Sequence, residues 1–274
     1  AGGTDRDGPH PPPGEGPLMS GRGPLHAGEP VLLIDRKRRR YLIDLETGGE
    51  FHSHSGVLSH DEMIGADEGT LFRSTRGMVF TALRPTITDF VLKMPRGAQV
   101  IYPKDIGPIL ILADIFPGAR VLESGLGSGA LSTGMLRAGA EITGYEIRDD
   151  FEEKARENVG RFLGTDALDR YATQVRDVYE GIDERDLDRV VLDLPEPWQV
   201  VPHAEKALRR GGIFLAYTPS IIQVSQLHEA LEASHFGFAE TTEVLNRGWH
   251  VQGNAVRPDH RMVAHTGFLT HARL

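Results

Sequence analysis

The chain of 274 residues contains no cysteine. That absence excludes disulfide bonds, thiolate metal sites and cysteine nucleophiles. The sequence also lacks a signal-peptide hydrophobic segment and any apolar run near the roughly 20 residues that cross a bilayer, so we expect a cytoplasmic protein without a membrane partner. Positive charge is in deficit, with 30 Lys and Arg against 39 Asp and Glu and a formal net charge of −9. Any nucleic-acid binding must therefore come from local basic patches.

The first third of the chain divides into a tail and a small domain. Residues 1–24 hold seven glycines and six prolines, which is typical of disorder, and we assign residues 1–28 to a disordered tail. Met19 leads towards the first expected strand, consistent with residues 1–18 being an upstream extension. Short β-like runs alternate with turn signals over residues 29–85, which predicts a small N-terminal β domain. The basic run Arg36–Arg40 lies between two apolar runs and is expected at a hairpin tip, either as a solvated turn or as a nucleic-acid contact.

Residues 86–274 follow the pattern of a parallel α/β sheet. Strands are expected at 119–123, 141–146, 171–176, 188–193 and 212–218, with helices at 128–138, 149–163, 199–209 and 221–234. The last apolar runs, 236–245 and 262–272, have no crossover helix between them and predict an antiparallel pair at the sheet edge. The second mononucleotide-binding half of a dinucleotide domain is absent from this pattern.

A glycine-rich turn is expected between the first strand and the first helix of this sheet. It comprises Glu123, Ser124, Gly125, Leu126, Gly127, Ser128, Gly129 and Ala130. Alternating glycines let the backbone turn sharply and approach a ligand without an intervening Cβ, while the helix N-terminus presents free N–H groups. This spacing indicates a nucleoside cofactor. It also satisfies the dinucleotide fingerprint, and a purely structural turn is a third interpretation.

Acidic residues near the turn favour S-adenosylmethionine. Glu146 ends the second expected strand, where a carboxylate accepts both ribose hydroxyls of an adenosine. Glu123 precedes the first glycine, where its charge would attract a cationic methionine end and repel a pyrophosphate. Asp177 ends the third expected strand, where an adenine amino group could bind. We therefore predict a class I S-adenosylmethionine-dependent methyltransferase domain, with a nicotinamide- or flavin-binding Rossmann domain as the alternative.

Asp193 is the candidate catalytic residue. It ends the fourth expected strand, in the run Asp193-Leu-Pro-Glu-Pro-Trp198, beside the crevice where open α/β sheets bind ligands. A carboxylate there can accept a hydrogen bond from the exocyclic amine of adenine, stabilising the positive charge that methylation at N1 creates, and can take up a proton if the product neutralises. The alternative is an aspartate that caps the following helix. Trp198 either stacks on the base or, as we expect, lies in the core.

Several motifs in this order resemble those of one enzyme family. They are Glu50–Gly56, His60-Asp61, Arg96-Gly-Ala-Gln-Val-Ile-Tyr-Pro-Lys-Asp105, Asp193–Trp198 and His265-Thr-Gly-Phe268. Over about residues 27–274 the chain is similar to the tRNA (adenine-58-N1)-methyltransferases of the bacterial and actinobacterial single-subunit type. The resemblance implies a Rossmann-like methyltransferase domain, S-adenosylmethionine as donor, transfer to N1 of adenine 58 in the T loop of tRNA, and a homotetramer.

The resemblance also implies the residues of the site. Those matching cofactor positions are Gln99, the turn Glu123–Ala130, Glu146, Asp177 and Asp193, with Gln99 and the turn on the methionine side. Those matching catalytic or target-base positions are Asp193, Tyr102 and Tyr217.

No metal site is expected, although His52, His54 and His60 have a spacing that zinc ligands can show. The resemblance places these histidines in the small β domain, where structural hydrogen bonding or RNA contact is favoured. Two other functions stay open at this point. One is a methyltransferase acting on a protein or small molecule, which the acidic charge suits, and the other is a non-catalytic RNA-binding scaffold.

Overall fold

The small β domain begins earlier than the sequence predicts. The computed structural model describes residues 23–97 and 99–274, so residues 1–22 of the expected tail lie outside the described residues. Residues 23–28 belong to the predicted tail, but they pack on the β domain: Leu25 is fully buried and Pro24 forms a bridge with Asp67. The backbone N–H of Leu25 donates to Ala66 O at 2.8 Å. The tail prediction was wrong for these residues because the side chain of Leu25 is buried in the core of the β domain.

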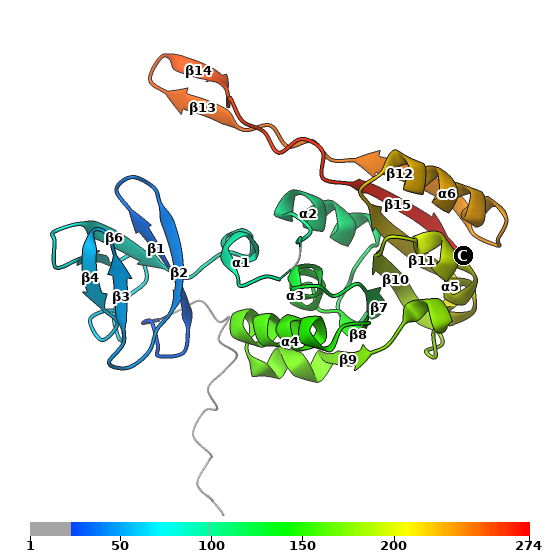
Figure 1. The fold of residues 1–274 in the computed structure, drawn as a ribbon, viewed down its shortest axis with the longest axis horizontal. Helices are drawn as coiled ribbons and strands as arrows, with labels where there is room; N and C mark the ends of the chain where they lie inside the picture. The colour runs from blue at the N-terminus through cyan, green and yellow to red at the C-terminus, as the bar shows by residue number, and fades with distance from the viewer. Residues whose placement is uncertain (1–22, 98) are drawn as a thin grey trace, which may run out of the picture.

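Six strands build this domain. They are β1 (Pro30–Asp35), β2 (Arg40–Asp44), β3 (Glu50–Ser53), β4 (Gly56–Ser59), β5 (Leu71–Arg73) and β6 (Val79–Leu83). Four form an antiparallel sheet in the order β2-β1-β6-β5, and β3 pairs with β4. Their inward side chains, among them Val31, Leu33, Phe72 and Phe80, form a separate core. The domain is visible at the blue end of the chain in Figure 1.

Among the residues that the structure describes, two ion pairs join the β domain to the rest of the molecule. Arg40 Nη1 donates to Asp89 Oδ1 at 2.5 Å, and Arg161 Nε donates to Asp44 Oδ1 at 2.7 Å. Both start or end on β2, which therefore lies against α1 (Ile87–Lys93) and α4 (Asp149–Leu163). Arg40 thus serves the domain junction, although it belongs to the basic run.

A seven-stranded sheet forms the larger part of the molecule, as the sequence pattern predicts. Its strands are β7 (Arg120–Ser124), β8 (Glu141–Glu146), β9 (Tyr171–Val175), β10 (Leu187–Asp193), β11 (Leu208–Thr218), β12 (Gly237–Glu243) and β15 (Phe268–Arg273). They are ordered β12-β15-β11-β10-β7-β8-β9, and β15 runs antiparallel to its neighbours β11 and β12. The predicted antiparallel edge is confirmed, although β15 begins six residues later than the expected run at 262.

Helices cover both faces of this sheet (Figure 1). One face packs against α1, α2 (Pro103–Leu112), α3 (Ala130–Arg137) and α4, and the other against α5 (Val201–Ala207) and α6 (Ile221–Glu232). Short 3₁₀ turns lie at η2 (Thr165–Arg170), η3 (Val178–Glu180) and η4 (Pro197–Val200). Trp198 packs against the core between the sheet and the helices α5 and α6, as expected. Among the described residues, no helix combines the length and apolarity required for a membrane span.

A two-stranded arm, β13 (Trp249–Gln252) and β14 (Ala255–Pro258), projects from the sheet edge between β12 and β15 (Figure 1). The arm was not predicted from the sequence. Its turn is Gly253-Asn254, with Gly253 at φ 55°, and the alternation on either side is a hairpin signal that was present in the sequence.

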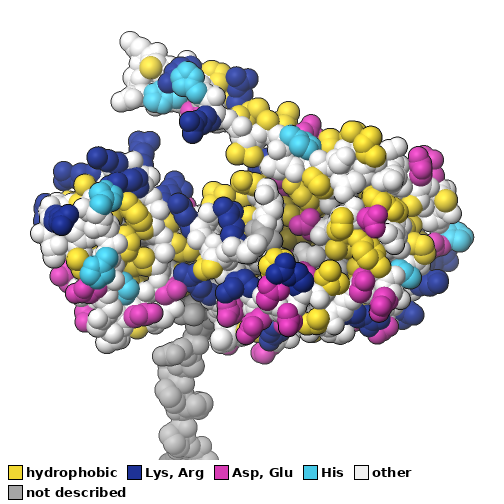
Figure 2. Space-filling view, viewed as in Figure 1, with side chains coloured by type: hydrophobic (Ala, Val, Ile, Leu, Met, Phe, Trp, Pro, Cys, Tyr) yellow, Lys and Arg dark blue, Asp and Glu magenta, His cyan; other side chains and the backbone are white. Residues whose placement is uncertain are grey.

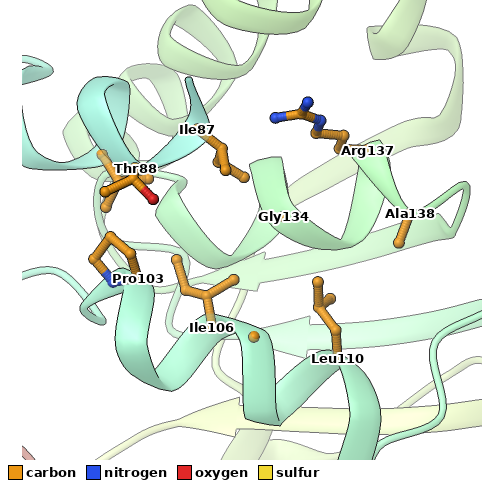
Figure 3. A pocket seen from close by; sticks show the side chains of 10 residues that line it. Ile87, Thr88, Pro103, Ile106, Leu110, Gly134, Arg137 and Ala138 are labelled. Carbon is orange, nitrogen blue, oxygen red and sulfur yellow. The ribbon is translucent and has the colours of Figure 1, made fainter. Parts of the chain in front are cut away.

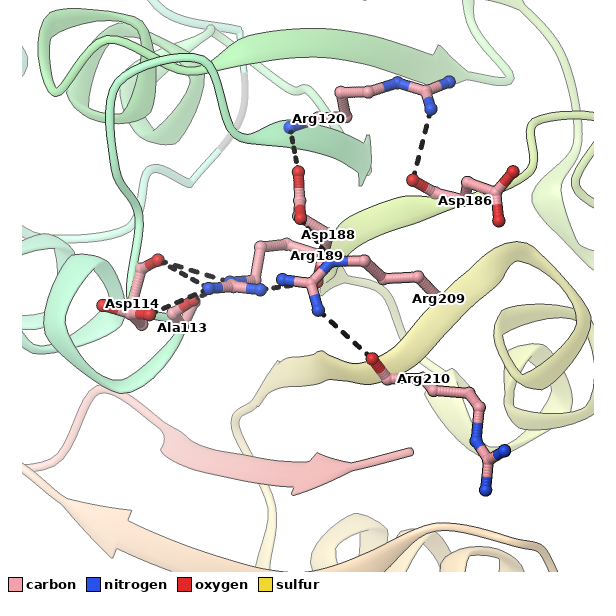
Figure 4. A network of polar contacts seen from close by, with 8 residues as sticks. All are labelled: Ala113, Asp114, Arg120, Asp186, Asp188, Arg189, Arg209 and Arg210. Carbon is pink, nitrogen blue, oxygen red and sulfur yellow. Dashed lines mark hydrogen bonds and ion pairs between the residues drawn. The ribbon is translucent and has the colours of Figure 1, made fainter.

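The amino-terminal edge of the sheet is held by a buried arginine (Figure 4). Arg189 on β10 is 2% exposed, and its guanidinium donates to the carbonyls of Ala113 and Asp114 and, at 2.9 Å, to the Asp114 carboxylate. These groups follow the last turn of α2, whose carbonyls lack partners within the helix. Arg189 therefore fixes the carboxyl end of α2 to the sheet.

Candidate active site

A cavity of about 300 Å³ opens at the carboxyl ends of β7, β8 and β10. The strand order reverses between β7 and β10, and open α/β sheets bind ligands at this kind of switch point. Seven predicted residues line the cavity: Gln99, Ser124, Gly125, Gly127, Glu146, Asp177 and Asp193. The structure therefore brings together side chains that lie as much as 94 positions apart in the chain.

The glycine turn has the geometry that the sequence predicts. Gly125 has φ 88°, and a Cβ built there would lie 2.1 Å from Asp193 O, so this position requires glycine. Gly129, at φ 78°, precedes α3, and a Cβ there would lie 2.9 Å from Ala155 O of α4. The first glycine lets the turn contact the end of β10, and the last lets α3 pack closely on α4.

Glu146 is oriented by the turn itself. The N–H of Gly127 donates to Glu146 Oε2 at 3.2 Å, and the N–H of Arg148 donates to Oε1 at 3.2 Å. A carboxylate has about four lone-pair sites, so each oxygen keeps acceptor capacity for a ligand. The side chain is 7% exposed and faces the cavity.

Asp177 follows β9 and has a local structural role. Its carboxylate accepts a hydrogen bond from the N–H of Tyr179 at 2.9 Å and so caps η3. It also lines the cavity.

Asp193 is paired in register with Tyr217 on the neighbouring parallel strand β11. The alternative interpretation as a helix cap is wrong, because η4 is preceded by Glu196 and α5 by Val200 at their N-cap positions. Burial, and secondly the negative charge of Glu146, raise the pKa of Asp193 to about 7. The carboxyl group is therefore poised to gain or lose a proton near neutral pH.

Glu123 lies beneath the cavity and does not line it. It is paired with Val191, which lies two residues before Asp193 on β10 and so on the same face of the sheet, and it is 1% exposed. Within residues 23–97 and 99–274, neither of its carboxyl oxygens has a hydrogen-bond partner. Burial raises the pKa of Glu123 to about 8. The nearby polar groups of Ser132 lower this pKa, and the negative charges of Asp193 and Glu146 raise it. A cationic ligand above this carboxyl group would relieve that electrostatic cost.

The other predicted residues surround the cavity without lining it. Leu126 packs on Gly144, Ser128 and Ala130 are buried, and Gly129 precedes α3. Tyr217 is 9% exposed and donates from its hydroxyl to Thr266 O at 2.5 Å. Tyr102 is the N-cap residue of α2, on the face of the sheet towards which Tyr217 points.

Some cavity residues were not predicted. They are Tyr145, Ile147, Arg148, Phe151, Val178, Tyr179, Leu194 and Pro195. Most directly follow Glu146, Asp177 or Asp193, so position after a strand end was the signal that could have found them. The guanidinium of Arg148 lies 3.8 Å from the centre of the Phe151 ring, forming one wall of the cavity.

The three histidines with zinc-like spacing, His52, His54 and His60, are accounted for by protein contacts. His60 is buried and its Nδ1 accepts a hydrogen bond from the N–H of Glu46 at 3.0 Å. His54 Nε2 is 2.6 Å from Arg39 Nη1, and His52 is paired with Glu50. Over the described part of the chain, no cluster of three metal-ligating side chains is found.

A larger cavity, of about 430 Å³, lies between α1, α2 and α3 (Figure 3). Its walls are mainly apolar, with Ile87, Ile106 and Leu110 among them, and Arg137 extends over it. It contains no carboxylate and none of the predicted residues. The carboxylate-lined cavity at the switch point is therefore the candidate active site.

The strand order with its antiparallel β15, together with this acidic cavity beside the glycine turn, defines a class I S-adenosylmethionine-dependent methyltransferase fold. Residues 77–257 match the family described as tRNA methyltransferase complex GCD14 subunit, and residues 23–71 match the TrmI-like N-terminal family. The chain belongs to this TrmI and GCD14 family of methyltransferases.

Individual relatives agree with this assignment. The tRNA (adenine(58)-N(1))-methyltransferase TrmI of Thermus thermophilus is 36% identical over 89% of this chain and 96% of its own length. The tRNA (adenine(57)-N(1)/adenine(58)-N(1))-methyltransferase TrmI of Methanocaldococcus jannaschii is 35% identical over 89% and 94%.

Solved structures show the same fold over nearly the whole chain. A SAM-dependent O-methyltransferase of Thermotoga maritima has a TM-score of 0.86 and 32% identity, covering 91% of this chain and 94% of that one. The tRNA (m1A58) methyltransferase TrmI of Aquifex aeolicus has a TM-score of 0.79 and 30% identity, covering 91% and 98%.

Proposed function

We propose that this protein transfers the methyl group of S-adenosylmethionine to N1 of adenine 58 in the T loop of tRNA. The observation that carries the proposal is the placement of Asp193 at the switch-point cavity, in register with Tyr217. The relatives named for this activity match nearly the full length of the chain, and the motif that contains Asp193 lies within the matched region.

The residues of the cavity fit this methyl donor. Its adenosine would extend from Glu146, whose fixed carboxylate has acceptors left for two ribose hydroxyls, to Asp177. Its methionine end would lie against Gln99 and the glycine turn, above the unpartnered carboxyl group of Glu123. When bound, the donor supplies an electrophilic methyl group on a positively charged sulfur. The negatively charged pyrophosphate of a dinucleotide cofactor would be repelled by these carboxylates.

We assign Asp193 to the acceptor side of the reaction. Adenine N1 would attack the methyl carbon through its lone pair while the bond from that carbon to sulfur breaks and leaves a neutral thioether, so no proton has to leave before the new bond forms. The methylated base is cationic, and a carboxylate that accepts from its exocyclic amine stabilises that charge as it develops. A cationic donor beside Asp193 favours its ionised form, which is the form that can accept this hydrogen bond.

We assign Tyr102 and Tyr217 to the walls of the target-base pocket. Tyr217 leaves the sheet on the same face as Asp193, and Tyr102 begins the helix that covers this face. Flipped bases are commonly held between aromatic side chains. Burial raises the pKa of Tyr217 to about 12, so its hydroxyl stays protonated and donates to Thr266 O.

We also propose that the β domain, residues 23–85, contacts tRNA, and that residues 86–274 form the catalytic domain. Figure 2 shows Lys and Arg side chains gathered over the β domain around the β1 to β2 hairpin. Arg76 Nη1 donates to His54 O at 3.0 Å and Arg39 contacts the His54 ring, so a second hairpin adjoins the basic tip. This local concentration can bind phosphates despite the net acidity.

Assembly into a homotetramer is supported by the projecting arm. Trp249, Val251, Val256 and Pro258 alternate along β13 and β14 and share one face in the observed register. Trp249 is 59% exposed, Val251 69% and Val256 61%. An isolated two-stranded hairpin is marginally stable in water, so an apolar face of this kind favours contact with another copy of the chain. Since the substrate is tRNA, we place the assembly in the cytoplasm.

Nucleoside mass spectrometry tests the proposal. Unmodified tRNA is incubated with the protein and S-adenosylmethionine, digested to nucleosides and analysed, with the Asp193→Asn protein as a matched control. We expect 1-methyladenosine with the wild-type protein. Methylation of a hydroxyl, as the name of the Thermotoga maritima relative indicates for that protein, or of a different base would overturn the proposed acceptor.

A further inference from the structure

Lys104 and Asp105 form a buried ion pair at the start of α2. Lys104 Nζ donates to Asp105 Oδ1 at 2.8 Å, to Val244 O at 2.7 Å and to Thr266 Oγ1 at 2.6 Å. Thr266 Oγ1 in turn donates to Asp105 Oδ2 at 2.7 Å. The Lys104 side chain is 7% exposed and that of Asp105 is fully buried. All three ammonium donors are therefore used, and the network leaves no open position for a ligand.

This network joins parts of the chain that are far apart in sequence. Lys104 follows Tyr102 and Pro103 at the first turn of α2, whereas Val244 and Thr266 lie just beyond β12 and before β15. Neither Lys104 nor Asp105 lines the cofactor cavity. Replacing a buried ion pair with apolar residues is often neutral or stabilising, so stability alone explains the pair poorly.

Thr266 connects the network to Tyr217. Its hydroxyl belongs to the network, while its carbonyl accepts from the Tyr217 hydroxyl at 2.5 Å. A Cβ on the next residue, Gly267, would lie 2.5 Å from Tyr217 Cζ, so the ring packs directly on this backbone. The same segment is anchored on its other side by His265, whose Nδ1 is 2.7 Å from Glu243 Oε1 and whose Nε2 is 2.8 Å from Pro219 O.

We infer that Lys104, Asp105 and Thr266 are positioning residues for methyl transfer, forming a clamp that fixes Tyr102 and Tyr217 relative to Asp193. The inference rests on the proposed function and assigns these residues no contact with donor or tRNA. Arg189 fixes the carboxyl end of α2 to β10, and the clamp fixes its amino end to the segment before β15. With both ends held, the helix presents Tyr102 in one place, which matters because a misplacement of about 1 Å can cost about a hundredfold in rate.

The test compares Thr266→Val with Thr266→Ser. Valine has the shape of threonine but removes the hydroxyl that bridges Lys104 and Asp105, whereas serine keeps it. We expect kcat for tRNA methylation to fall by about tenfold or more in Thr266→Val and to be largely restored in Thr266→Ser. The Kd for S-adenosylhomocysteine should change by less than about twofold in both, because the clamp does not reach the cofactor cavity.

Thr241→Val is the matched control. Thr241 Oγ1 bonds to Thr270 Oγ1 at 2.7 Å and to His228 Nε2 at 2.8 Å, so this variant also removes a hydroxyl network between β12 and β15 but has no link to α2. Its kcat should stay at the wild-type value. If Thr266→Val does not fold, the double variant Lys104→Met/Asp105→Leu replaces the whole ion pair and should fold while losing kcat to a similar extent.

The outcomes separate the two claims. A folded Thr266→Val or double variant with wild-type kcat overturns the clamp, and so does a parallel loss of melting temperature, cofactor affinity and kcat, which would indicate a merely structural role. A wild-type protein that makes no 1-methyladenosine overturns the proposed function, and the inference with it.

Discussion

Asp193 and Tyr217 are partners on the parallel strands β10 and β11, so their side chains leave the sheet on the same face at its carboxyl end. Leu215, two residues before Tyr217, pairs with Val191, which in turn pairs with Glu123 of β7. The buried carboxyl group of Glu123, the carboxyl group of Asp193 at the cavity and the ring of Tyr217 thus lie on one face of the sheet. The arrangement follows from strand periodicity and register alone.

Asp193→Asn should keep the fold and most donor binding but lose transition-state stabilisation. By analogy with removing one electrostatic donor elsewhere, we expect a loss of about 2.7–4 kcal/mol, or roughly a hundredfold or more in rate. Single-turnover methylation at saturating tRNA isolates this step, and circular dichroism controls for folding. Near-wild-type turnover would transfer the catalytic assignment to Tyr102 or Tyr217.

The pH profile of kcat/KM should report the same carboxyl group. Because burial raises the pKa of Asp193 to about 7 and the ionised form is the active one, kcat/KM should rise as pH increases through that value. The Asp193→Asn enzyme should show residual activity without this inflection. An identical inflection in the variant would assign it to another group.

Glu146→Ala should weaken the methyl donor more than tRNA. Each ribose hydroxyl bonded to the carboxylate contributes about 1.5–3 kcal/mol, and the alanine also leaves the N–H groups of Gly127 and Arg148 without their acceptor. Glu146→Gln, which keeps one acceptor oxygen, should be intermediate. Titration calorimetry with S-adenosylhomocysteine measures both, and unchanged donor affinity would remove Glu146 from the cofactor site.

Glu123 should make the donor-free protein less stable as pH rises. Its pKa is raised from an ordinary value of 4.5 to about 8, so the folded state binds the proton more tightly than the unfolded state. The stability from this difference is complete below the ordinary value and is lost as pH increases through about 8. Glu123→Gln mimics the protonated form, and its melting temperature should rise relative to wild type over this window. A pH-independent difference would contradict the assignment.

The exposed part of the basic hairpin should contribute to tRNA binding. Arg39 and Arg40 are paired with Asp35 and Asp89, so the variant to test replaces Arg36, Lys37 and Arg38 with glutamine. The slope of log K against log salt should flatten by up to about 0.7–0.9 for each phosphate that these side chains neutralise in the wild-type complex. Lys206→Gln/Arg210→Gln, near the amino-terminal start of β11, removes two positive charges away from the hairpin and is the control for a nonspecific effect of lost positive charge. An unaltered slope would leave the tip as a solvated turn.

The sequence predicted the elements whose signals are local. The glycine turn at 123–130, the strand-end acids Glu146 and Asp193, and the hairpin tip at 36–40 each combine a short motif with a strand boundary, and the structure has them where expected. The clamp could not be predicted in this way. Lys104 and Thr266 are 162 positions apart in the chain, and they meet only because α2 packs against the segment before β15. The burial of Glu123 was not predicted either. The sequence placed this residue next to the turn, but whether it is buried depends on which face of β7 it occupies.

Methylation of matched tRNA transcripts that differ at one base tests directly whether adenine 58 is the methyl acceptor. A transcript with adenine 58 should yield 1-methyladenosine at that position, and one in which adenine 58 is replaced by guanine should yield none, while both bind the protein with similar affinity. Mapping of the product by ribonuclease digestion and mass spectrometry also shows whether adenine 57 is modified. Full 1-methyladenosine formation in the transcript without adenine 58, or no product in either, would contradict the account.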